Sequence, residues 1–244
     1  MSEVVVLGNS LGTSRMVWDR QVPALSERFT LLRYELPGHG GSVADGPVSV
    51  SGLGAGVLEL LDRHGVERAA YCGISLGGMV GMWLAAHATD RISALGLVCT
   101  SAYLPPAEGW QERASAVLAG GLAPIAWPSI GRWFTPSFIT SEPRLIESFA
   151  AQLETVDPAG YAACCLAIAG MDLRADLARI SAPTLVISGA DDPATPPAHG
   201  AAIAAGIAGS KHLIVDGAHL ANVSSPSEVT TALLDHLGVT MLGR

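Results

Sequence analysis

The chain has 244 residues, of which 49% are hydrophobic and 15% charged, and its formal net charge at pH 7 is −8. This length suits one α/β domain with a substantial buried core. The acidic balance, with scattered Lys and Arg, argues against a nucleic-acid partner, and no apolar run reaches the ~18 residues that a membrane span needs. Because no basic segment precedes an apolar one at the start of the chain, we expect no signal peptide and a cytoplasmic protein.

Short apolar runs, the first rich in β-branched residues, alternate with helix-like stretches along most of the chain. The six predicted strands, in chain order, are residues 4–8, 29–34, 69–72, 94–99, 184–188 and 212–215. The predicted helices are residues 18–26, 49–64, 76–88, 198–205 and 227–237. Such alternation indicates an α/β fold with a mostly parallel sheet covered by helices on both faces.

One interval breaks this alternation, because no strand is evident between residues 103 and 178. It contains Trp110, Trp127 and Trp133, several prolines and short helical pieces. We predict a helical cap at residues 103–178, inserted into a core formed by residues 1–102 and 179–244. A long loop is the alternative, but unstructured loops of this size are rare in compact domains. A cap over the sheet edge would exclude water and shape a substrate pocket.

The pentapeptide Gly73-Ile74-Ser75-Leu76-Gly77 lies between a predicted strand and a predicted helix. A G-x-S-x-G at that junction is typical of a nucleophile elbow, in which the serine sits on a tight turn. The glycines are needed because the turn leaves no room for side chains close to the backbone. Ser75 is therefore the candidate nucleophile, and it requires a base to take its proton.

The acid and the base are expected later in the chain, in the order Ser, acid, His. Asp191 and Asp192 both follow the strand at residues 184–188, and either could instead cap a turn. His219 follows the last strand, where open α/β sheets place their sites. Four other histidines fall on predicted helices, His212 opens a strand, and His39 precedes Ser75 in a turn that we expect to pack against the site.

The oxyanion hole requires two backbone N–H groups that point at the reacting oxygen. We expect one from Leu76, directly after the nucleophile, and one from Leu11 in the loop after the first strand. The alternative for that loop is that it only reverses the chain. The four cysteines show neither zinc spacing nor a C-x-x-C motif, so we expect no metal and no disulfide framework.

With these motifs in place, the chain resembles the α/β-hydrolase superfamily and, more narrowly, the 3-oxoadipate enol-lactonases of bacterial aromatic catabolism. The resemblance covers nearly the whole chain. It is carried by Asn9-Ser10-Leu11-Gly12-Thr13, Gly73 to Gly81 with Trp83, Trp133-Phe134-Thr135-Pro136, Asp192 to Pro197, and Gly217 to Val223. The Asn9-Ser10 start and the run from His219 to Val223 are the parts more specific to the enol-lactonases.

The resemblance implies hydrolysis of a small anionic lactone, 3-oxoadipate enol-lactone, to 3-oxoadipate without a cofactor. Ser75 would attack, His219 would act as base, and Asp192, rather than Asp191, would hold the imidazole. The substrate carboxylate calls for a cationic anchor, for which Arg132 is the candidate, with a solvated cap arginine as the alternative. Trp133 would either wall the pocket or only pack the cap.

Two departures from the lactonase pattern are visible. The chain starts almost directly in the strand that normally comes third, so the leading antiparallel hairpin has no counterpart. Glu35-Leu36-Pro37 stands where these lactonases usually carry Asp-x-Arg. Two other functions stay open: another small-ester, lactone or carbon–carbon bond hydrolase with the same triad, and a hydrolase-fold receptor with slow turnover. The sequence does not indicate an oligomeric state.

Overall fold

A six-stranded, fully parallel sheet forms the centre of the computed structural model, which describes residues 3–241. Its strands are β1 (Val4–Gly8), β2 (Thr30–Arg33), β3 (Ala69–Ile74), β4 (Ile92–Val98), β5 (Thr184–Gly189) and β6 (Lys211–Val215). Their order across the sheet is β2-β1-β3-β4-β5-β6. Every residue of β3 and β5 is buried, as expected for parallel strands that are covered on both faces.

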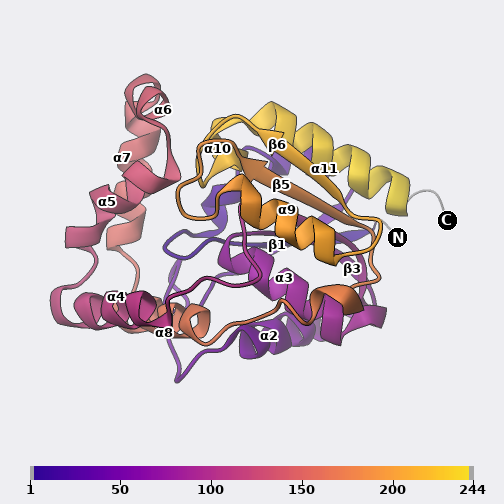
Figure 1. Ribbon diagram of the computed structural model, residues 1–244, viewed down its shortest axis with the longest axis horizontal. Helices are drawn as coiled ribbons and strands as arrows, with labels where there is room; N and C mark the ends of the chain where they lie inside the picture. Colours follow the sequence, from indigo (N-terminus) through magenta and orange to yellow (C-terminus); the bar gives the residue numbers. More distant parts are fainter. Residues whose placement is uncertain (1–2, 242–244) are drawn as a thin grey trace.

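Helices cover both faces of this sheet (Figure 1). They are α1 (Val22–Ser26), α2 (Val50–Arg63), α3 (Leu76–His87), α9 (Pro197–Gly206), α10 (Ala221–Ser224) and α11 (Pro226–Met241). Leu95 and Gly96 are neighbours in β4 and therefore point to opposite faces. A Cβ at Gly81 of α3 would meet Leu95, whereas a Cβ at Gly96 would meet Leu233 of α11, so α3 and α11 pack on opposite faces.

The predicted fold class is confirmed, and the differences are at element ends. Residues 18–26 were predicted as one helix, but a short 3₁₀ helix, Arg15–Trp18, comes first and is capped by the Ser14 side chain. The turn α10 was not predicted, because four residues are too short to show a helical period. Within the described residues the sheet has no antiparallel pair, and β2 forms one of its edges.

The segment predicted as a cap contains helices α4 (Ala107–Gly120), α5 (Ala123–Trp133), α6 (Pro136–Ser141), α7 (Pro143–Glu154) and α8 (Pro158–Ala169). They gather at one end of the sheet (Figure 1). A proline lies in the first two positions of α5, α6, α7 and α8, where its missing N–H costs no helical hydrogen bond. The segment therefore contains helices rather than one long loop, while the division of the chain into a core and a cap at residues 103–178 stays a prediction.

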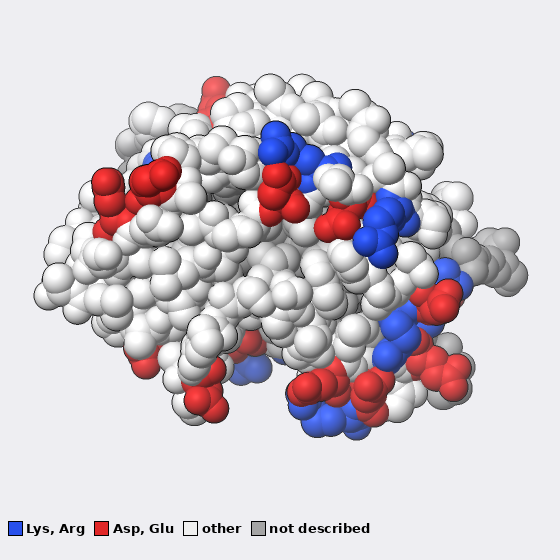
Figure 2. All heavy atoms as spheres, turned by 60° about the horizontal axis from the view of Figure 1, so that its bottom comes forward, with Lys and Arg blue, Asp and Glu red and all other residues white. Residues whose placement is uncertain are grey.

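The base of this segment is closed by backbone contacts. Tyr103 pairs with Asp172 in an isolated antiparallel bridge, and the Leu173 N–H donates to the Ala102 carbonyl at 2.8 Å. On the face shown in Figure 2, basic and acidic side chains lie next to one another without a continuous basic area. No helix in residues 3–241 is long and apolar enough to cross a membrane.

The turn between β3 and α3 lies against the loop after β1 with no space between the two backbones. A Cβ at Gly77 would lie 2.5 Å from the Gly8 carbonyl carbon and 2.9 Å from the Asn9 nitrogen. The Gly77 N–H donates to the Asn9 carbonyl at 3.0 Å. Only glycine fits at position 77 unless one of these backbones moves.

We therefore expect Gly77→Ala to lower the free energy of unfolding by about 1–3 kcal/mol, because overpacking at a backbone contact cannot be relieved by a side chain. The matched control is Gly56→Ala, since Gly56 is exposed in α2 and has no atom within 4 Å of its would-be Cβ. That control should raise the free energy of unfolding by roughly 0.5–1 kcal/mol. Urea unfolding of both variants measures this, and equal effects would contradict the packing account.

Candidate active site

Ser75 lies on the turn between β3 and α3 in a conformation that non-glycine residues rarely adopt. Its φ is 55° and its ψ is −117°. The Ser75 N–H donates to the Val98 carbonyl at 3.0 Å, and the Ser75 carbonyl accepts from Thr100 Oγ1 at 2.7 Å. These bonds to Val98, the last residue of β4, and from Thr100, two residues beyond the strand, hold the turn in place, so the neighbouring structure maintains the strain.

The structure brings Ser75, His219 and Asp192 together although they are distant in sequence. His219 Nε2 lies 2.9 Å from Ser75 Oγ, and His219 Nδ1 lies 2.8 Å from Asp192 Oδ2. With its Nδ1 proton donated to the carboxylate, the neutral imidazole presents Nε2 as an acceptor for the serine proton. All three residues are buried: Ser75 is 7% exposed, His219 5% and Asp192 3%.

Asp192 is held as an ionised carboxylate. Burial by itself would raise its pKa, but the electrostatic attraction of the nearby His219 ring and hydrogen bonds from His219 and Thr195 outweigh burial and lower the pKa below its usual value. Thr195 Oγ1 donates to Asp192 Oδ2 at 2.7 Å, and the Ala194 and Thr195 N–H groups donate to Oδ1. The carboxylate is thereby oriented toward the imidazole, whereas Asp191 is exposed.

The two predicted oxyanion donors lie on the elements that flank Ser75. Leu76 is the first residue of α3, and its N–H therefore has no acceptor within the helix. Leu11 lies in the loop after β1, and its N–H donates to no backbone acceptor in the described chain. Leu11 lines the same cavity as Ser75. Their role as oxyanion donors stays a prediction that this placement supports.

The His39 ring supports the loop after β1. Its Nε2 accepts from the Gly12 N–H at 3.0 Å, and its Nδ1 lies 2.8 Å from the Pro37 carbonyl. This pair of contacts requires a neutral ring with the proton on Nδ1. Burial lowers the pKa of His39 to about 4, against the opposing effect of the bond to Pro37. As predicted, His39 packs against the site.

Two backbone hydrogen bonds join the end of α5 in the cap to the loop that contains His219. The His219 N–H donates to the Arg132 carbonyl at 3.4 Å, and the Leu220 N–H donates to the Trp133 carbonyl at 3.0 Å. Trp133 both lines the cavity and packs the cap, since it is 6% exposed and meets the Phe149 ring edge to face. Arg132 also lines the cavity.

A cavity of about 320 Å³ opens above Ser75 between the sheet and the cap. The cap residues in its walls that the sequence analysis did not assign to the site include Trp110, Arg113 and Tyr161. Trp110 and Arg113 are three residues apart in α4 and so share a helix face. That spacing is the signal that could have placed Arg113 in the pocket once Trp110 was assigned to the inner face.

Glu35, which stands where the lactonases usually carry Asp, supports the loop after β1. It accepts from the Asn9 side chain at 3.2 Å and from the Arg15 N–H at 3.0 Å, and burial raises its pKa. Across residues 3–241 no cluster of three or more His, Cys, Asp or Glu side chains could hold a metal ion. The four cysteines are buried and unbridged. That the chain requires no metal or cofactor stays a prediction.

Comparisons with known proteins agree with this geometry. The family described as alpha/beta hydrolase fold matches residues 3–226. A 3-oxoadipate enol-lactonase of Acinetobacter baylyi is 38% identical over 230 residues, which are 94% of this chain and 86% of that protein.

Two solved structures superpose over nearly the whole chain. An enol-lactonase from Burkholderia xenovorans LB400 has a TM-score of 0.95 at 38% identity and covers 97% of this chain and 92% of its own. A hydrolase from Pseudomonas aeruginosa PA01 has a TM-score of 0.94 at 45% identity and covers 97% of this chain and 90% of its own. The resemblance to the enol-lactonases is thus confirmed as a resemblance.

If Ser75 and His219 act as nucleophile and base, Ser75→Ala and His219→Ala should each lower kcat for p-nitrophenyl acetate by about three to six powers of ten. The neutral control is Ser148→Ala, because Ser148 is exposed on α7 and far from these residues in the chain. Circular dichroism would show that the variants keep the fold. Near-normal turnover in either triad variant would overturn the assignment.

The burial of neutral His39 predicts a pH dependence of stability. A pKa of 6.5 when unfolded and about 4 when folded means that protonation favours the unfolded chain. The contribution of His39 to the free energy of unfolding is fully present above pH 6.5 and is lost as the pH falls toward 4. The total loss is about 3 kcal/mol. Urea unfolding at several pH values should show a smaller loss in His39→Gln, and an identical loss would contradict the account.

Proposed function

The chain belongs to the alpha/beta hydrolase family, and from that premise we propose that it hydrolyses 3-oxoadipate enol-lactone to 3-oxoadipate. One observation carries the proposal: the hydrogen-bonded series Ser75, His219 and Asp192 opens onto a small cavity whose cap wall contains arginine. The similarity to enol-lactonases supports the choice of substrate. Such an enzyme would act in the breakdown of aromatic compounds.

In the first step Ser75 Oγ attacks the lactone carbonyl while His219 Nε2 takes the serine proton. The negative oxygen of the tetrahedral intermediate is stabilised by the N–H groups of Leu11 and Leu76. Asp192 stabilises the imidazolium that forms, because its carboxylate is ionised and already bonded to Nδ1. When the ring C–O bond breaks, the enolate oxygen leaves and takes the proton from His219.

This leaving oxygen stays attached to the acyl group, because a lactone is a cyclic ester. The ring-opened enol converts to the ketone while the chain is bound to Ser75. A water molecule then attacks the acyl carbon, and His219 takes its proton and returns one to Ser75 Oγ as the ester bond breaks. The product is the open diacid, and the enzyme is regenerated without a cofactor.

The cavity supports a small substrate. Its volume of about 320 Å³ is at the low end for ligand sites in proteins. Trp110, Trp133 and Ile168 give it apolar walls, while Arg113 and Arg132 add positive charge. These properties fit a compact anionic lactone better than a long-chain ester.

The test is the ring opening of freshly generated 3-oxoadipate enol-lactone, followed by ultraviolet absorbance, with Ser75→Ala as control. We expect rapid loss of the lactone with the wild-type protein and a rate close to the uncatalysed one with the variant. Ser75-dependent cleavage of p-nitrophenyl esters without lactone opening would retain the hydrolase and discard the lactonase. Tight lactone binding without turnover of either substrate would favour the receptor hypothesis instead.

A further inference from the structure

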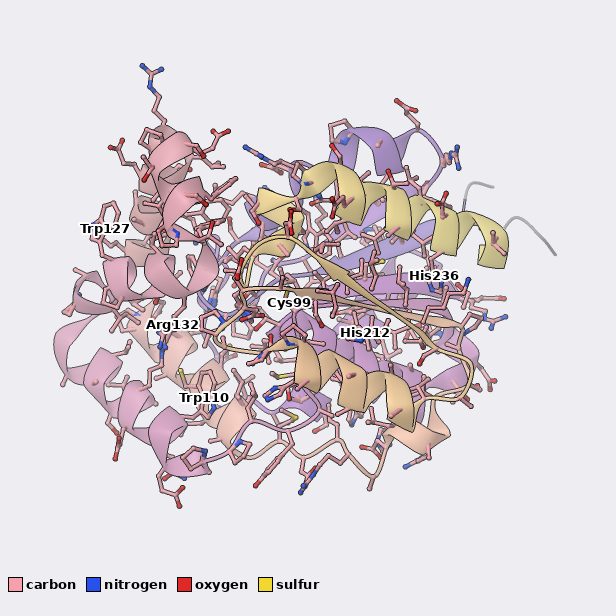
Figure 3. The ribbon with its side chains drawn as sticks, turned by 45° about the horizontal axis from the view of Figure 1, so that its top comes forward. Cys99, Trp110, Trp127, Arg132, His212 and His236 are labelled. Carbon is pink, nitrogen blue, oxygen red and sulfur yellow. The ribbon has the colours of Figure 1, made fainter. Side chains whose placement is uncertain are left out.

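Two guanidinium groups line the cap side of the cavity without a carboxylate partner. Arg113 comes from α4 and Arg132 from the last turn of α5, and both line the cavity that contains Ser75 and His219. Seven other arginines of the described chain lie within 4.0 Å of a carboxylate, but these two do not. Figure 3 shows the Arg132 and Trp127 side chains on opposite sides of α5, and Trp127 is 56% exposed.

Arg113 is held in place by neutral partners only. Its Nε donates to the Tyr161 hydroxyl at 2.8 Å, and its Nη2 donates to Ser129 Oγ at 3.1 Å. Tyr161 lies on α8 and Ser129 on α5, so the guanidinium joins three cap helices. These bonds use two of the five N–H groups of an arginine, and the other three have no acceptor in the described residues.

The two positive groups act on each other. Desolvation and then the charge of Arg113 lower the pKa of the Arg132 guanidinium. Two like charges at one apolar wall are unfavourable unless an anion shares them, and a carboxylate is the anion whose geometry suits guanidinium donors. The N–H groups of Arg113 that have no acceptor and the repulsion between Arg113 and Arg132 therefore both favour the binding of a carboxylate at this wall.

We propose that Arg113 and Arg132 together bind the free carboxylate of the substrate and make the site selective for acyl groups that end in a carboxylate. This inference rests on the proposed function of the site as a serine hydrolase, and it adds Arg113 as a specificity-determining residue. Tyr161 is a positioning residue, since it acts by holding the Arg113 guanidinium.

The chemistry of a lactone gives this pair a role in both steps. When the ring opens, the carboxylate and the acyl carbon become the two ends of one six-carbon chain. The arginine pair can then hold the same carboxylate during acylation and deacylation. Because the Arg132 carbonyl accepts from the His219 N–H, the anchor and the base are connected through one residue.

The test compares two esters of equal shape: the mono-p-nitrophenyl ester of adipic acid, which ends in a carboxylate, and the p-nitrophenyl ester of adipic acid monoamide. For the wild-type protein we expect kcat/KM to be roughly tenfold to a hundredfold higher for the carboxylate. In Arg113→Gln and in Arg132→Gln this ratio should fall by roughly tenfold, and in the double variant it should approach one. Arg144→Gln is the matched control, because Arg144 is an exposed, unpaired cap arginine outside the cavity.

Tyr161→Phe provides a second measurement in case an arginine variant fails to fold. It keeps both charges but removes the bond to Arg113 Nε, so the ratio should fall by a smaller factor through a higher KM for the carboxylate ester. A wild-type ratio near one would overturn the proposal, as would a ratio that Arg113→Gln and Tyr161→Phe leave unchanged. A high ratio that both arginines control, without opening of the enol-lactone, would support the anchor and refute only the lactonase function.

Discussion

The close contact between the backbone at Gly77 and the backbone at Gly8 and Asn9 is the constraint on which the site depends. It places the start of α3 directly beside the loop after β1, so that Leu76 and Leu11 lie on two segments in direct contact. The same contact keeps the turn at Ser75 in its strained form, since the turn has no room to relax toward β1. A side chain at this contact would change the position of the nucleophile and of both predicted oxyanion donors together.

Several contacts join the cap to the core around the site. Backbone hydrogen bonds join the end of α5 to the loop that contains His219. The N–H of Asp157, the residue before α8, donates to the Gly38 carbonyl in the core. The Arg20 guanidinium of the core also lies 3.8 Å from the Glu142 carboxylate in the cap. A displacement of α5 would therefore move His219 as well as the cavity wall.

The sequence could predict the core of the site because strand ends of a parallel sheet converge at one edge. Ser75, Asp192 and His219 each follow a buried apolar strand, and the fold brings such positions together whatever lies between them. Asp191 and Asp192 could not be separated by composition, because burial and the bonds to Thr195 distinguish them only in three dimensions. The resemblance resolved that choice.

The cap could be predicted only in outline. Its prolines look like helix breakers in the sequence, yet four of them lie in the first two positions of helices and Pro128 lies inside α5. The direction of each helix depends on packing that no strand register determines. Arg113 was missed for this reason: it follows the exposed residues Gln111 and Glu112, and the side of α4 that faces the cavity depends on the packing of α4 on α8. The proposed substrate anchor thus lies in the part of the chain that sequence patterns describe least.

The most direct test of this account is the reaction with an alkyl p-nitrophenyl methylphosphonate, which forms a stable tetrahedral adduct with an activated serine. The account predicts release of one equivalent of p-nitrophenolate per chain and an adduct on the peptide that contains Ser75, with no rapid release in His219→Ala. Peptide mass spectrometry locates the adduct. An adduct on another serine, or equal reaction of the His219→Ala variant, would contradict the claim that His219 activates Ser75.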